Sequence, residues 1–162
     1  MTKKRPLQQL IMLFEQLGAE DAEDWARSEI EEDIPQLARY LFLRQAWRRI
    51  IPHRDNSWIE DQIAVAKHDP GGPGSGIGPA LNRVLAHGVE PSDLSEIVRA
   101  MQYGLLFDIC YLIDDPGDVE PEVHDVNWAL FEVDEANKPG RIIAGLHESV
   151  LSLDPTGMEM RP

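Results

Sequence analysis

The residues best suited to chemistry are two histidines that each precede an acid. His124 is followed by Asp125, and His147 is followed by Glu148. Imidazole nitrogens and carboxylate oxygens bind divalent cations together, so these four residues, with Asp108 from an apolar stretch, form a candidate metal site. We therefore keep a divalent-metal-binding protein or a metal-dependent hydrolase as one hypothesis for the function.

Stricter catalytic motifs do not fit the same part of the chain. His147 and Glu148 match half of the zinc-protease helix, but Leu151 occupies the position of its second histidine. Ser149 lies close to His147 and Asp154 in the sequence, yet no G-x-S-x-G elbow surrounds it. Catalytic residues stay unassigned, whether the chain is an enzyme stays open, and we expect no cofactor unless it is a divalent metal ion.

Asp108 stands within a strongly apolar segment, where a carboxylate costs several kcal/mol unless it is paired or protonated. In a helix, Gly104 and Tyr111 would share its face. We favour a structural role, in which an arginine or a capping amide pairs with Asp108. A metal ligand or a general base is the alternative.

A second acidic run extends from Asp108 to the next base, Lys138, and contains ten acids, Asp108 included. Its prolines and spacing do not match a calcium-binding EF-hand loop. Two of its acids end a predicted helix, where the macrodipole disfavours negative charge, so we expect something to compensate them. The candidate partner-binding carboxylates are Asp114, Asp115, Asp118, Glu120 and Glu122.

Composition narrows the possible partners. The 162 residues include 15 Lys and Arg against 29 Asp and Glu, a net charge of −14, which repels nucleic acid and anionic membranes. Cys110, the single cysteine, lies in an apolar segment and predicts a buried thiol in a reducing, cytoplasmic location. The N-terminal stretch lacks the apolar core of a signal peptide, and we expect no membrane span.

Apolar periodicity predicts a mainly α fold: a single-domain bundle of six or seven helices over residues 1–162, around a central buried helix at about 91–115. Residues 126–133 read as a strand or a short helix, with at most one small β-hairpin near 128–143. Replacing Leu106 or Ile109 with Ala is expected to cost about 2 to 5 kcal/mol.

Two further segments carry specific expectations. Residues 69–79 contain five glycines and three prolines, so we expect an exposed, mobile loop rather than a phosphate-binding one. Residues 35–54 contain five arginines and no acid, directly after an acidic stretch. We favour pairing between these two segments over a phosphate clamp formed by Arg44 and Arg48.

The acidity motivates our first functional hypothesis, a non-enzymatic protein-interaction module, adaptor-like or inhibitor-like, that binds a basic protein partner. The metal hypothesis is the alternative. Sequence alone does not give the oligomeric state or the identity of the partner.

Overall fold

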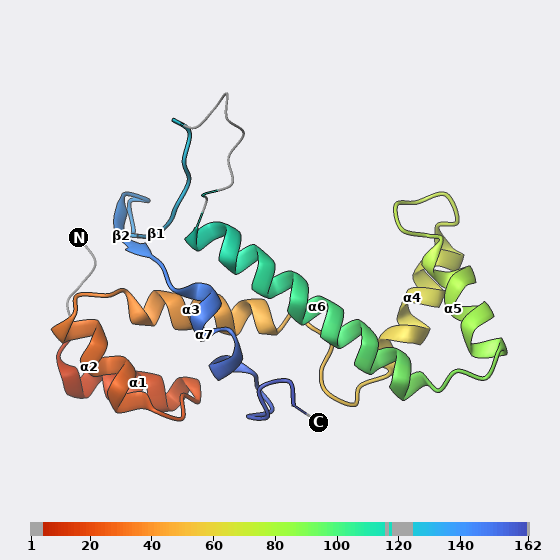
Figure 1. Ribbon diagram of the computed structural model, residues 1–162, viewed down its shortest axis with the longest axis horizontal. Coiled ribbons are helices and arrows are strands. Elements are labelled where there is room, and N and C mark those ends of the chain that lie inside the picture. The colour runs from red at the N-terminus through yellow and green to blue at the C-terminus, as the bar shows by residue number, and fades with distance from the viewer. Residues whose placement is uncertain (1–4, 116, 118–124, 162) are drawn as a thin grey trace. The chain divides into compact units, whose positions relative to one another are not determined.

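The computed structural model describes residues 5–115, 117 and 125–161. Within these residues the fold is mainly helical with one small antiparallel hairpin, so the predicted fold class is confirmed (Figure 1). The helices are α1 (Leu7–Leu17), α2 (Ala22–Glu31), α3 (Gln36–Trp47), α4 (Ser57–His68), α5 (Ile77–Ala86), α6 (Pro91–Asp114) and α7 (Leu146–Ser149). The remaining elements are β1 (Leu130–Val133), β2 (Pro139–Ile143) and the 3₁₀ helix η2 (Leu151–Leu153).

The chain divides into two compact units. Unit 1 comprises Met1–Trp47 and Leu106–Pro162, and unit 2 comprises Arg48–Leu105. The division therefore falls after α3 and again within α6. The expectation that the whole chain is a single domain stays a prediction.

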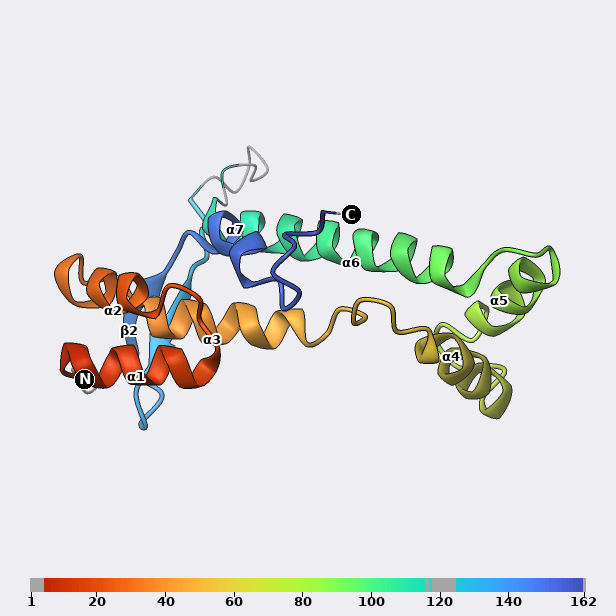
Figure 2. The same ribbon diagram turned by 90° about the horizontal axis from the view of Figure 1, so that it is seen from below.

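Unit 1 has an aromatic core formed by its first three helices. Phe14 of α1 is fully buried, and its ring centroid lies 6.0 Å from that of Trp25 and 5.5 Å from that of Tyr40. The chain can turn from α1 into α2 because Gly18 adopts a left-handed conformation, with φ of 86°, and its N–H bonds the carbonyl of Glu15. Figure 2 shows α1, α2 and α3 lying together in unit 1.

A second group of buried side chains surrounds the other end of α3. Leu43 and Trp47 are buried, and the indole N–H of Trp47 donates to the carbonyl of Val150 at 2.8 Å. Leu146 and Val150 of the C-terminal segment are fully buried as well. Because α3 contacts α2, β2, α7 and η2, it is the element around which unit 1 is built.

The hairpin is joined to the helices by a charged contact. Leu130 of β1 pairs with Ile143 of β2 in an antiparallel register. Arg141 of β2 bonds Glu132 at 2.9 Å and Glu29 of α2 at 2.5 Å, and the side-chain hydrogen bond with Glu132 raises the pKa of Arg141. The acidic helix thus finds a basic partner in β2, and the residues 126–133 include a strand rather than a helix.

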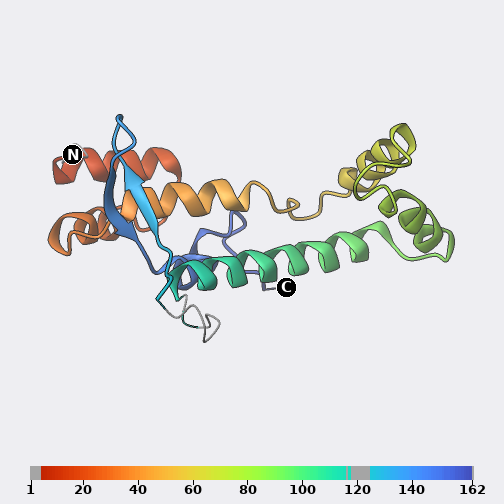
Figure 3. The same ribbon diagram turned by 90° about the horizontal axis from the view of Figure 1, so that it is seen from above.

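Unit 2 contains the α4–α5 pair and the first part of α6 (Figure 3). Helices α4 and α5 pack closely at Gly78, where an added Cβ would lie 2.5 Å from the Cβ of Ala66. The glycine-rich connection between them is mostly exposed, as predicted, and its backbone makes successive turn hydrogen bonds, including Ser75 N–H to Gly72 O. Its mobility stays a prediction.

The prediction that the helix at about 91–115 is the buried centre of the fold is wrong. The helix exists at the predicted place, but its apolar side chains are not buried on nearly every face. Five of them are between 44% and 69% exposed: Ile97, Met101, Leu105, Ile109 and Leu112. Helical periodicity identifies an apolar face, but it does not reveal whether other elements cover that face.

The side of α6 that contacts other elements is instead largely polar. In unit 2, Ser95 and Arg99 are buried, and Gln102 accepts a hydrogen bond from the N–H of Ile51. In unit 1, Cys110 is buried and the Asp114 side chain is 4% exposed. The fully buried residues of α6 are thus polar in unit 2, whereas unit 1 buries the Cys110 thiol and the Asp114 carboxylate, and both parts leave large apolar side chains in solvent.

Within the described part of the chain, no helix combines the length and the apolar character that a membrane crossing requires.

Candidate interaction surface

The C-terminal end of α6 is held by a buried carboxylate. One oxygen of Asp114, Oδ2, lies 2.6 Å from Nδ1 of His147 and accepts the main-chain N–H of His147 at 2.9 Å. These two contacts compensate a negative charge at a helix C-terminus, as expected from the sequence. The other oxygen, Oδ1, is buried and has no hydrogen-bond partner among the described residues.

The ring of His147 is flanked by two aromatic neighbours. Its centroid lies 5.1 Å from that of Tyr111 and 6.1 Å from that of Phe107, both in edge-to-face geometry. A carboxylate on Nδ1 is the arrangement that orients a general base, but it also serves as a clasp between two helices. The hydroxyl of Ser149 accepts from Arg39 at 3.3 Å, so its described partner is an arginine and not this imidazole.

Arg39 of α3 extends under the start of α7. Its Nε donates to the carbonyl of Ala144 at 2.7 Å, and burial lowers the pKa of its guanidinium, partly offset by the charges of Glu148 and Asp114. An added Cβ on Gly145 would lie 2.3 Å from Arg39 Nη2, so the guanidinium would have to shift, and the φ of 69° at this position independently favours glycine. The cluster binds α3, α6 and α7 together and has a clear structural role.

The predicted metal ligands that lie among the described residues do not gather into one site. Asp108 and Asp125 are exposed, Glu148 lies near Arg39, and His147 bonds Asp114. Among the described residues, no group of three or more His, Cys, Asp or Glu is close enough to hold a metal ion. His124 lies outside the described residues, so the metal hypothesis that includes it stays a prediction.

The part of α6 in unit 1 presents apolar side chains to solvent beside an indole. Ile109 is 44% exposed and Leu112 is 53% exposed. The indole N–H of Trp128 donates to the carbonyl of Leu112 at 2.8 Å, which fixes this half-exposed ring beside the helix end. Leu112 and Trp128 thus form an exposed apolar patch on unit 1.

The hairpin presents a second exposed apolar patch. Its inner face carries Leu130 and Ile143, whereas the outer face carries Phe131 and Ile142, which are direct cross-strand partners. Val133, two residues after Phe131, shares the outer face and is 54% exposed. Strands usually place polar side chains toward solvent, so an apolar outer face indicates a surface that another molecule can cover.

Carboxylates outnumber bases in this part of the sequence, since residues 108–142 contain ten acids and two bases, Lys138 and Arg141. No Lys or Arg occurs between residues 108 and 137, and Asp108, Asp115, Asp125 and Glu135 are exposed. We call the exposed apolar side chains and these four acids the 108–142 surface. Its apolar members are Ile109, Tyr111, Leu112, Val126, Trp128, Phe131, Val133 and Ile142.

The predicted partner-binding acids need one correction. The side chain of Asp114 is only 4% exposed, because its carboxylate contacts His147 at the end of α6. It therefore cannot face a partner. Asp115 is exposed and accepts the N–H of Gly117 at 3.2 Å. Asp118, Glu120 and Glu122 lie outside the described residues. The exposed hydrophobic residues were not singled out from the sequence as candidates, although alternating Phe131 and Val133 in an acidic stretch was a usable signal.

Comparisons with protein-family models, with curated proteins and with solved structures give no match to this chain.

Proposed function

We propose that the chain is a non-enzymatic interaction module that binds a basic protein partner through the 108–142 surface. The observation that carries this proposal is the solvent-facing apolar pair Phe131 and Ile142, which adjoins in sequence an acid-rich stretch without Lys or Arg, residues 108–137. Of the two bases in the hairpin, Lys138 and Arg141, the second is paired with Glu132 and Glu29. Interfaces combine a desolvated apolar centre with a charged rim that selects the partner. In this proposal the exposed apolar side chains form the centre of the interface, and the exposed acids form its rim.

The expected partner has an apolar ridge flanked by Lys or Arg. Burial of large side chains such as Trp128 and Phe131 would supply most of the affinity, because aromatic anchors dominate interface energetics. The exposed carboxylates would accelerate association and make it dependent on salt. We place this interaction in the cytoplasm, with support from the single, fully buried thiol of Cys110.

Capture from a cell lysate by the immobilised chain, at low and at moderate salt, tests the proposal. The double variant Phe131→Ser with Ile142→Ser removes the exposed apolar pair without opening the described core. Val65→Ser is the matched control, since Val65 is 63% exposed on α4 of unit 2. Thermal melting checks that each variant is folded.

We expect the wild type and Val65→Ser to retain the same basic protein, more strongly at low salt. The hairpin double variant should lose it. Failure to retain any protein at either salt concentration, or equal capture by the hairpin variant, would contradict the proposal.

A further inference from the structure

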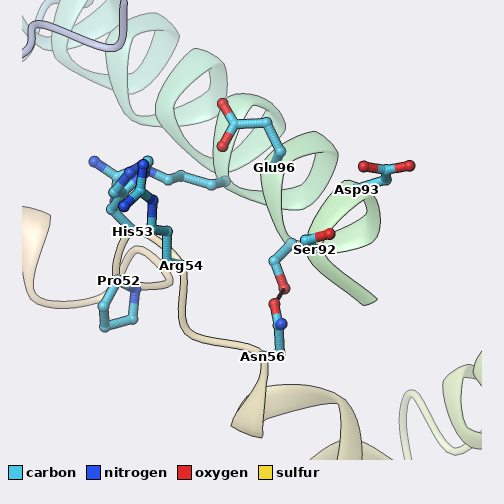
Figure 4. Close-up of a pocket in the computed structure, with 9 residues that line it drawn as sticks. Pro52, His53, Arg54, Asn56, Ser92, Asp93 and Glu96 are labelled. Atoms are coloured by element: carbon cyan, nitrogen blue, oxygen red, sulfur yellow. Dashed lines mark hydrogen bonds between the residues drawn. The ribbon is translucent and has the colours of Figure 1, made fainter. Parts of the chain in front are cut away.

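Unit 2 contains a polar pocket that the interaction surface does not use. The pocket has a volume of about 480 Å³ and lies between residues 52–56 and the first turns of α6 (Figure 4). Volumes of about 300 to 1,000 Å³ are typical of small-molecule sites. Apart from Pro52, every lining side chain is polar or charged. Such a lining suits a small polar ligand better than an apolar one.

Two buried side chains of α6 help to line the pocket. The Ser95 side chain accepts from the indole N–H of Trp58 at 2.8 Å and donates to Asn56 Oδ1 at 2.6 Å. Arg99, which is 3% exposed, donates to the carbonyl of Ile51 at 2.8 Å. These hydrogen bonds hold this wall in place before any ligand arrives, which lowers the ordering cost of binding.

The walls of the pocket carry both signs of charge. Its lining residues include His53, Arg54 and Arg99 on the basic side and Asp93 and Glu96 on the acidic side, although the Asp93 carboxylate points away from His53 and Arg54. Figure 4 shows the side chains of His53 and Arg54 gathered on one side, with Asp93 and Glu96 on α6. Guanidinium groups bind carboxylates in charge-assisted hydrogen bonds, and carboxylates bind ammonium groups in the same way.

The balance of charges selects between ligand classes. A simple anion such as phosphate would meet Glu96 inside the pocket, and the chain's net charge of −14 would repel it at long range. A simple cation would meet Arg54. A ligand with one positive and one negative group satisfies both walls and carries no net charge to be repelled.

We propose that this pocket binds a small zwitterion of the α-amino-acid class, with its carboxylate toward Arg54 and Arg99 and its ammonium group toward Glu96. Arg54 and Glu96 are exposed, so they contact the ligand without supporting the fold. The pocket lies wholly within unit 2, and its occupation is independent of the partner proposed for unit 1.

Ligand-observed NMR on the full chain, with each of the common L-amino acids at millimolar concentration, tests the proposal directly. At least one amino acid should bind. Its N-acetyl derivative, which lacks the ammonium group, and its carboxamide, which lacks the carboxylate, should each bind about tenfold more weakly, the equivalent of one charge-assisted contact. Inorganic phosphate is the comparison anion and should bind more weakly than the amino acid.

Substitutions test which side chain binds the carboxylate of the ligand and which binds its ammonium group. Arg54→Gln and Glu96→Gln should each weaken binding of the amino acid about tenfold, and Glu96→Gln should leave binding of the N-acetyl derivative unchanged. Arg83→Gln and Glu60→Gln, exposed charges of unit 2 outside the pocket lining, are the matched controls and should bind normally.

Three results would each overturn the proposal. The first is that no amino acid binds the wild type, and the second is that phosphate binds better than all of them. The third is that binding is insensitive to both Arg54→Gln and Glu96→Gln. The first two need no variant, so they remain decisive if a substitution disturbs folding.

Discussion

Unit 1 and unit 2 differ sharply in net charge. Over the full sequence, unit 1 has nine Lys and Arg against 22 Asp and Glu, a net charge of −13. Unit 2 has six against seven, a net charge of −1. The acidity of the chain is therefore a property of one unit, and a surface for a basic partner belongs there. A pocket for a neutral zwitterion belongs in the other.

The interiors differ as well. Unit 1 buries an aromatic group, in which Trp25 and Tyr40 lie 5.4 Å apart and both contact Phe14. Unit 2 buries smaller apolar side chains, such as Ile59 and Leu81, together with hydrogen-bonded polar groups on α6. Unit 1 should therefore respond most to loss of volume, and unit 2 to changes in close packing.

The largest expected effect is the loss of the aromatic core of unit 1. Phe14→Ala should cost about 3 to 5 kcal/mol, because it removes a fully buried ring and leaves a cavity. Ile109→Ala should cost less than about 1 kcal/mol, since that side chain is 44% exposed. This smaller expected cost for Ile109→Ala replaces the cost of about 2 to 5 kcal/mol expected from the sequence. The urea concentrations at the midpoint of unfolding compare the two variants. Equal shifts of the midpoint would show that Phe14 is not at the centre of the core of unit 1.

A smaller effect should distinguish two adjacent acids at the end of α6. Asp114→Ala leaves the main-chain N–H of His147 without its acceptor and should cost about 1.5 to 3 kcal/mol. Asp115→Ala removes an exposed carboxylate and should change stability by about 0.5 kcal/mol or less. If chemical denaturation finds the two variants equally stable, the clasp between α6 and α7 contributes nothing.

Two glycines of unit 2 should respond in opposite directions. Gly78→Ala should destabilise by about 1 to 3 kcal/mol, because its new Cβ would lie 2.5 Å from Ala66 and force α4 and α5 apart. Gly104→Ala should stabilise by about 0.5 to 1 kcal/mol, since the helix has open space there and gains propensity. Melting temperatures of the two variants test this prediction. If Gly104→Ala also destabilises the chain, the space around Gly104 is occupied by other atoms.

A further expected effect is a pH dependence in unit 1. Burial raises the pKa of the Cys110 thiol from 9.0 to about 11, with the charge of Asp114 adding to the shift. The unfolded thiol ionises near 9, so its contribution to stability is complete below pH 9 and declines as the pH rises toward 11. Between pH 8 and pH 10, the wild type should lose more stability than Cys110→Ala. Equal losses would indicate an accessible thiol.

The sequence predicted which elements form better than it predicted which faces they bury. The helix at 91–114 and the hairpin were predictable, because apolar spacing and the turn residues near Asn137 are local signals. The inward face of α6 was not, because Ser95, Arg99 and Asp114 recur at helical spacing just as the apolar residues do. Their partners, Trp58, Ile51 and His147, come from distant segments.

For the candidate surface, the sequence predicted the negative charge but not the exposed apolar residues. The acidic stretch was evident from composition, but exposure of Phe131 and Ile142 depends on the strand pairing and on which hairpin face meets the helices. Asp114 was misassigned to a partner for a similar reason, since its pairing with His147 spans 33 residues. The pocket in unit 2 also joins distant segments, and no local motif marks it.

Hydrogen exchange in the presence of a basic amphipathic helical peptide of Leu and Lys tests whether unit 1 carries the interaction surface. We expect slower exchange at residues 108–112 and 130–143, no change at 48–105, and loss of the effect in moderate salt. A matched peptide of Leu and Glu should give no protection. Protection confined to 48–105, or equal protection by the acidic peptide, would contradict the assignment of the interaction surface to unit 1.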